Sequence, residues 1–191
     1  MALKLIIPAV ALAVSLAEAK LHLRVDVPDD DALITALITA ATELAEQATG
    51  RAIMLQTWAL TLEAFPVAVE LTRVPAQSIT SIRYIDTAGV LQTLDASSYA
   101  LDNASDFGFS YIWPTYGLKW PSARDQVNAV AVLYIAGYAD AAAVPESIKA
   151  WIKLMVGAMY ENREAETVGN GSPIKLGFAD RLLDRYKVWA L

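Results

Sequence analysis

The stretch AVAVLYIAGY, residues 129–138, decides the fold class of this 191-residue chain. It is a continuous apolar run of strand length, and such runs are typical of the most buried strand of a sheet. Before it, from Ile53 onwards, short segments rich in Val, Ile, Thr, Tyr and Trp alternate with turn residues. After Gly137 a helical repeat begins, with Pro145 suited to its first turn. The stretch therefore belongs to a sheet that ends where a helix follows.

About six antiparallel strands are predicted between residues 54 and 138. Asp86-Thr87-Ala88-Gly89 separates two of them and is a turn sequence typical of a β-hairpin. Residues 103–127 are rich in aromatic residues, proline and glycine, and are predicted to form a loop. The predicted strands are 54–62, 67–72, 79–85, 90–94, 98–102 and 129–138.

Helical periodicity flanks the predicted sheet on both sides. Residues 30–49 carry apolar side chains at helical spacing, Gly50 supplies a stop, and Asp29 or Asp30 is suited to cap the first turn. On the other side, an apolar stripe runs from Ile148 to Tyr160 and predicts a helix that ends near 166–168.

A hinge and a last helix follow. Gly169-Asn170-Gly171-Ser172-Pro173 predicts a flexible break, and residues 178–188 predict the helix. The predicted fold class is therefore α+β. A four-helix connector frame, with two N-terminal and two C-terminal helices, carries an inserted antiparallel β-sheet of about six strands. The parts are residues 1–53, 54–140 and 141–191, within one integrated domain.

The first twenty residues allow two interpretations. Lys4, the apolar run 5–14 and Ala17-Glu18-Ala19 resemble a secretory signal with its cleavage site. Alternatively, Ser15-Leu16-Ala17-Glu18 is a capping box that starts a short helix, Leu16–Val25. The apolar run is shorter than the roughly 20 residues that a membrane span needs, so no membrane contact is predicted.

Composition narrows the possible chemistry. The chain contains no cysteine, which excludes thiolate catalysis, cysteine-ligated metals and disulfides. It contains one histidine, His22, and no G-x-S-x-G nucleophile elbow. The net charge is −6 and the sequence has no segment rich in Lys and Arg, so electrostatic binding of nucleic acid is disfavoured. Hydrophobic residues make up 55% of the chain, which indicates a large core or surfaces buried against partner chains.

Residues 155–166, MVGAMYENREAE, run from an apolar stretch into a cluster of charges. Glu161, Glu164 and Glu166 are candidates for acid–base catalysis, in which two carboxyl groups face each other about 5–10 Å apart. All three lie near the end of one predicted helix, so they share one exposed end instead of facing each other across a cleft. A structural or interface role is favoured, and neither an enzymatic activity nor a cofactor or metal site is predicted.

The aromatic loop 103–127 also has alternative interpretations. Its rings suit stacking on bases or sugars, packing over the sheet, or contact with another protein. Nucleic acid is disfavoured because positive charge is lacking nearby. An exported binding protein that uses this loop on a carbohydrate or peptide is the alternative function. The rings are those of Phe107, Phe109, Tyr111, Trp113, Tyr116 and Trp120.

A series of short motifs extends along nearly the whole chain. They are SLAEAK (15–20), HLRVD (22–26), DDALI (30–34), TGR (49–51), QTW (56–58), YIAGY (134–138) and YENRE (160–164). In their order and spacing they resemble the head–tail connector (adaptor) proteins of long-tailed phages and gene transfer agents.

The resemblance implies a structural protein without enzymatic activity. Such proteins form a ring, usually of twelve copies, at the head–tail junction of a virion or phage-like particle, after assembly in the host cytoplasm. They bind the portal protein on one side and a stopper or tail-completion protein on the other, and DNA passes through without sequence-specific binding. The resemblance also implies that Leu16–Val25 is a helix of the mature protein.

Three groups of side chains are the predicted contact sites. The segment 174–191 behind the hinge is expected to dock on the portal, because a hinged tail can become ordered against a partner. The portal-contact candidates are Phe178, Leu182, Leu183, Tyr186 and Trp189. The subunit-interface candidates are Tyr160, Glu161, Arg163 and Glu164. The candidates for a partner contact in the aromatic loop are Phe107, Phe109, Tyr111 and Trp113.

Overall fold

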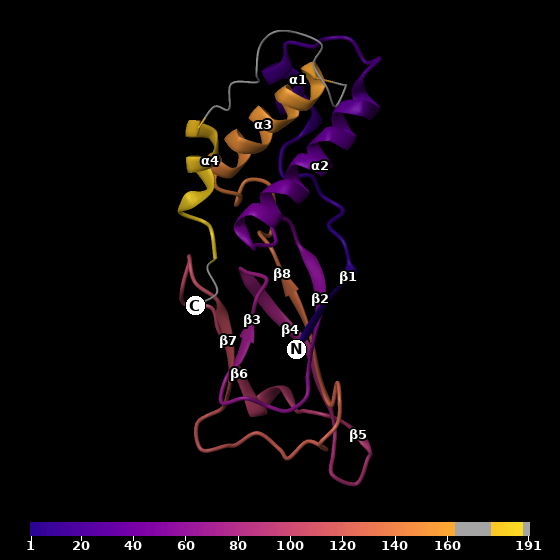
Figure 1. The fold of residues 1–191 in the computed structure, drawn as a ribbon, viewed down its shortest axis with the longest axis vertical. Helices are drawn as coiled ribbons and strands as arrows, with labels where there is room; N and C mark the ends of the chain where they lie inside the picture. Colours follow the sequence, from indigo (N-terminus) through magenta and orange to yellow (C-terminus); the bar gives the residue numbers. More distant parts are fainter. Residues whose placement is uncertain (163–176, 189–191) are drawn as a thin grey trace.

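The computed structural model describes residues 1–162 and 177–188. The molecule is elongated, with the helices gathered at one end and the strands at the other (Figure 1). Each end has its own cluster of buried apolar side chains. The two ends meet around residues 49–56, where α2 leads into the sheet.

Among the described residues, four α-helices form the helical end: α1 (Leu16–Leu23), α2 (Asp31–Thr49), α3 (Glu146–Glu161) and α4 (Gly177–Asp184). Buried residues recur at helical spacing on α2 and α3, for example Ile34 and Ile38 in one core with Ile148 and Ile152. Apolar spacing in the sequence therefore located these helices correctly. The end of α3 was predicted too late, because the backbone of Asn162 leaves the helical conformation and its side chain donates to the Ala158 carbonyl.

The starts of the two N-terminal helices differ. The predicted capping box is present: Ser15 Oγ accepts from the Glu18 amide at 3.2 Å, and the Glu18 carboxylate accepts from the Ser15 amide at 2.8 Å. Asp30 occupies the N-cap position of α2 but makes no side-chain capping bond. Its carboxylate instead accepts a hydrogen bond from Tyr160, so the predicted side-chain cap by Asp30 is wrong.

The larger sheet has the strand order β1-β2-β8-β4-β5, and all its pairs are antiparallel. The strands are β1 (Ala2–Ile7), β2 (Gln56–Leu62), β4 (Ala76–Ile85), β5 (Leu91–Thr93) and β8 (Val130–Ala136). The prediction that the AVAVLYIAGY strand is the most buried is confirmed. It becomes β8, the central strand, with Val130, Val132, Tyr134 and Ala136 alternately buried on one face.

The smaller sheet has the order β3-β7-β6 and packs on the larger one. Its strands are β3 (Val69–Leu71), β6 (Tyr99–Asp102) and β7 (Ser110–Pro114), with a short 3-10 turn at Ala96–Ser98. Buried Leu71 and Ile112 from this sheet join Leu60, Val132 and Ile82 from the larger one in a single cluster. The sheet end is therefore a two-layer β structure.

The prediction of one sheet of about six strands requires correction. Within the described residues there are eight strands in two sheets. The N-terminal strand β1 was missed because it lies at an edge and nearly all its side chains are exposed, so it lacks the alternation that marks a half-buried strand. The second missed strand, β7, lies inside the predicted loop, where Ile112 is buried between Val69 and Leu101.

Candidate interaction surfaces

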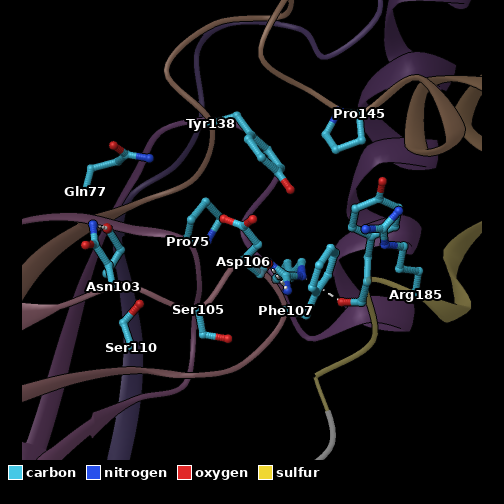
Figure 2. A pocket seen from close by; sticks show the side chains of 13 residues that line it. Pro75, Gln77, Asn103, Ser105, Asp106, Phe107, Ser110, Tyr138, Pro145 and Arg185 are labelled. Atoms are coloured by element: carbon cyan, nitrogen blue, oxygen red, sulfur yellow. Dashed lines mark hydrogen bonds between the residues drawn. The ribbon is translucent and has the colours of Figure 1, made fainter.

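A polar and aromatic pocket lies where the helical end meets the sheet end (Figure 2). One wall comes from the aromatic loop, including Asp106 and Phe107. The pocket is also lined by Tyr138, which follows β8, and by Arg185 and Tyr186, which follow α4. The pocket thus joins two of the three predicted contact groups, which lie about 80 residues apart in the sequence.

Arg51 lines this pocket and is 1% exposed. Its Nε donates to the Tyr186 carbonyl at 2.6 Å, and Nη2 donates to the Asp106 carbonyl at 2.8 Å. Burial lowers the pKa of Arg51 from its ordinary value, while the neighbouring Tyr138 and Tyr186 oppose that shift. Arg51 therefore fastens the loop and the C-terminal segment to the end of α2. The TGR motif contains Arg51, but nothing in the motif predicts that this side chain is buried.

The ring of Phe107 contacts the C-terminal segment directly. Its centroid lies 6.0 Å from that of Tyr186, and the guanidinium carbon of Arg185 lies 4.5 Å from the centroid of the Phe107 ring. Both arrangements are favourable, the second as a cation–π contact. A predicted loop contact, Phe107, and a predicted portal contact, Tyr186, are therefore packed against each other in the free chain.

The portal-contact candidates on α4 are packed to different degrees. Leu183 is 1% exposed within the helical core, whereas Leu182 and Tyr186 lie at its margin. Phe178 lies in α4, and Trp189 lies outside the described residues. The helix lies beside α3 at the helical end of the molecule (Figure 1).

The subunit-interface candidates begin at the last turn of α3. The hydroxyl of Tyr160 bonds to Asp30 of the same chain, and Glu161 is exposed. Arg163 and Glu164 lie outside the described residues, as does Glu166. Of this group the structure therefore describes Tyr160, which is hydrogen-bonded within its own chain, and Glu161, which is exposed.

The remaining aromatic residues of the loop do not form one stacking platform with Phe107. Tyr111 and Trp113 lie in β7, where Trp113 is exposed. Trp120 stacks on Phe65 at 5.0 Å between centroids and donates through Nε1 to the Val67 carbonyl. Phe109 lines a separate groove beside Val188. The rings thus serve several local contacts.

Several apolar side chains are exposed at the strand end of the molecule, which the sequence did not reveal. Most of them lie in the loops that connect β2 to β3, β4 to β5 and β7 to β8, and one lies in β5. These loops are tied down by the Trp120–Val67 hydrogen bond and by a bridge between Asp86 and Ala123. The exposed side chains are Val67, Val90, Leu91, Tyr116, Leu118 and Val127.

A second polar cluster stiffens the junction between the two ends. Glu46 Oε1 accepts from the Ile53 amide at 2.7 Å and from the Gln56 side-chain amide at 2.6 Å. Burial raises the pKa of Glu46, and these two hydrogen bonds oppose that rise. Arg73 donates to the carbonyls of Glu46 and Arg51.

Two kinds of feature matter here in the described part of the chain: clusters of metal-ligating side chains and helices able to cross a membrane. Residues 1–162 and 177–188 contain no group of three or more Asp, Glu or His placed to hold a metal ion. Within the same ranges, each helix is too short or too polar to cross a membrane.

Comparison with known families gives a match over part of the chain. Residues 13–88 match the family described as "Phage gp6-like head-tail connector protein". The resemblance to head–tail connectors stated from the sequence is therefore confirmed. That family is one of structural connectors, which agrees with the prediction that this protein is not an enzyme. No curated protein sequence gives a significant match.

Solved structures extend the similarity to the whole fold. A chain of "Virion of native gene transfer agent (GTA) particle" superposes with a TM-score of 0.80 and 23% identity, covering 100% of this chain and 97% of that chain. A chain of "Neck of empty GTA particle computed with C6 symmetry" gives 0.78 and 23%, with the same coverage. One from "Neck of native GTA particle computed with C12 symmetry" gives 0.73 and 21%, again with that coverage. Together with the family match, these similarities support a connector role.

Proposed function

We propose that this protein is a connector subunit that forms a ring between the portal of a DNA-filled capsid and the stopper or tail-completion proteins. The observation that carries the proposal is the fold similarity over the whole chain to chains of two particle-neck structures. A ring of twelve copies agrees with the C12 symmetry of one such neck structure. The ring would sit at the head–tail junction of a virion or phage-like particle, after assembly in the host cytoplasm.

Passage of DNA through the ring is consistent with the charge of the chain. The net charge is −6. Tight phosphate binding requires clustered Lys and Arg, and a channel that gripped phosphate would hinder ejection. In this proposal DNA slides past the subunits without sequence-specific contacts.

In this proposal the C-terminal segment 174–191 docks on the portal. Its described helix, α4, has eight residues, and a helix of this length is marginal in water unless it packs against something. In the free chain that packing comes from α3 and the buried Leu183. On docking, the portal would supply it, with Phe178, Leu182, Tyr186 and Trp189 as anchors.

The other two groups keep their proposed roles. Glu161, Arg163 and Glu164 would contact the neighbouring subunit at the end of α3, together with Tyr160. Exposed Trp113, with Phe109 and Tyr111, would contact a partner on the tail side. Glu161 and Trp113 are both exposed, so their side chains are available for such contacts.

The experiment is to mix the purified protein with the portal encoded beside it and to image the product by electron microscopy. A rotationally symmetric ring on the portal is expected. The variant Leu182→Ser should lose the ring, whereas Leu21→Ser, at a leucine that is 82% exposed on α1, should retain it. If the wild-type protein stayed monomeric and the portal carried no bound ring, the proposal would be contradicted.

A further inference from the structure

We infer that Arg51 and Phe107 form a latch that holds the C-terminal segment 185–188 against the loop 103–109. The latch keeps Phe107 and Tyr186 packed against each other until the C-terminal segment is released. It deepens the proposed function, on which its role in assembly rests. The latch itself is a property of the free subunit and is testable there.

The first component of the latch is a set of three hydrogen bonds at the end of α2. Arg51 donates to the carbonyls of Tyr186 and Asp106, and thus holds both segments with one guanidinium. The amide of Val188 donates to the Thr49 carbonyl at 2.8 Å. Gly50 lies between Thr49 and Arg51 in the sequence. It adopts a left-handed φ of 74°, which ends α2 and turns the chain at Arg51. The end of α2 is therefore the fixed side of the latch.

The second component is the direct contact between the two segments that the latch joins. Phe107 is 39% exposed, and part of its ring is covered by Tyr186 and by the guanidinium of Arg185. If residues 185–188 moved away, Phe107 would lose both neighbours and Arg51 would lose one of its two carbonyl acceptors. The position of the loop thus depends on the presence of the C-terminal segment.

Such a dependence is reciprocal. Any partner that binds the C-terminal segment in its released form shifts the loop toward a free state, and a partner that captures Phe107 weakens the hold on the C-terminal segment by the same factor. For a connector, portal binding would therefore expose the loop for the second partner. The latch would impose an order on the two docking events.

The test is hydrogen–deuterium exchange of the isolated full-length protein, without the portal. Phe107→Ala should increase exchange in residues 185–188 by about two- to five-fold, the range expected for loss of an aromatic and cation–π contact. Tyr116→Ala is the matched control, because Tyr116 is fully exposed. Exchange in α2 and α3 should stay at the wild-type level in both variants, which verifies that the fold is retained.

The reciprocal variant is Val188→Pro, which removes the amide that donates to Thr49. It should increase exchange in residues 103–109, although no loop residue has changed. Equal exchange at 185–188 in Phe107→Ala and Tyr116→Ala, or an unchanged loop in Val188→Pro, would overturn the latch. Since no portal is present, this outcome is separate from failure of the proposed function, which would appear as loss of ring formation on the portal.

Discussion

The hydroxyl of Tyr160 donates a hydrogen bond to the carboxylate of Asp30, 130 residues earlier in the chain. This bond joins the last turn of α3 to the first residue before α2. It gives a structural reason for Tyr160 in the YENRE motif and for Asp30 in the acidic run 29–31. The sequence suggested other roles for both residues, a subunit contact for the tyrosine and helix capping for the aspartate.

Removal of this hydroxyl should weaken the fold. Tyr160→Phe is expected to lower the free energy of unfolding by about 1.5–3 kcal/mol, the range for a hydrogen bond to a charged group. Urea denaturation provides the measurement. Tyr116→Phe, at a fully exposed tyrosine, should have no effect. Equal stability of the two variants would show that the Asp30 bond contributes nothing.

Gly137 in the YIAGY motif should tolerate no side chain. Its φ is 117°, and an added Cβ would collide with the Met54 carbonyl, where Met54 bridges to Tyr138. Gly137→Ala is expected to cost on the order of 3 kcal/mol through strain and displacement of Met54. Thermal unfolding compares it with Gly117→Ala, where φ is also positive but nothing lies within 4 Å. Gly117→Ala should lower the free energy of unfolding by about 1–2 kcal/mol through backbone strain alone. Equal losses in the two variants would exclude a contribution from the collision with Met54.

Glu46 should make stability fall as pH rises from acidic to neutral. Because its folded pKa is raised by burial, its contribution is complete below its unfolded value of 4.5 and is lost as pH rises through the folded value. Glu46→Gln keeps an oxygen that can accept from Ile53 and Gln56 and cannot ionise. The variant should therefore become more stable relative to the wild type as pH rises from about 4 to about 7. Denaturant titrations at both pH values measure this, with exposed Glu63→Gln as the control.

The capping box at the start of α1 should contribute measurably. Ser15→Ala removes the hydroxyl that accepts from the Glu18 amide and should lower stability by about 1 kcal/mol. Ser15→Asn, which retains a capping oxygen, should restore most of the loss. Urea denaturation of both variants makes the measurement. A full effect in both variants would mean that the cap is not the cause.

Charge reversal at Arg163 tests the role predicted for the YENRE motif in ring contacts. Arg163→Glu should reduce ring formation on the portal, because it places three acidic residues in the run 161–164. Electron microscopy of the portal mixture counts the rings, and urea denaturation shows whether the subunit itself remains stable. Unchanged assembly together with unchanged stability would refute this interpretation of the motif.

The sequence by itself determined the features that depend on neighbours in the chain. Apolar spacing located α2 and α3, the serine–glutamate pair located the start of α1, and the AVAVLYIAGY run marked the central strand. These features are local because helix periodicity, capping and strand composition act over a few residues.

Only the tertiary structure decided the features made by residues far apart. β1 is held at the sheet edge by backbone pairing with β2. Its side chains are nearly all exposed, so the sequence shows no alternation of buried and exposed residues there. β7 takes its place through Ile112, and Arg51 is buried because two carbonyls from distant segments accept its hydrogen bonds. Likewise, Phe107 and Tyr186 were separate candidates in the sequence and became one contact in the fold. Long-range packing chooses such partners, and no short window of sequence contains both members of the pair.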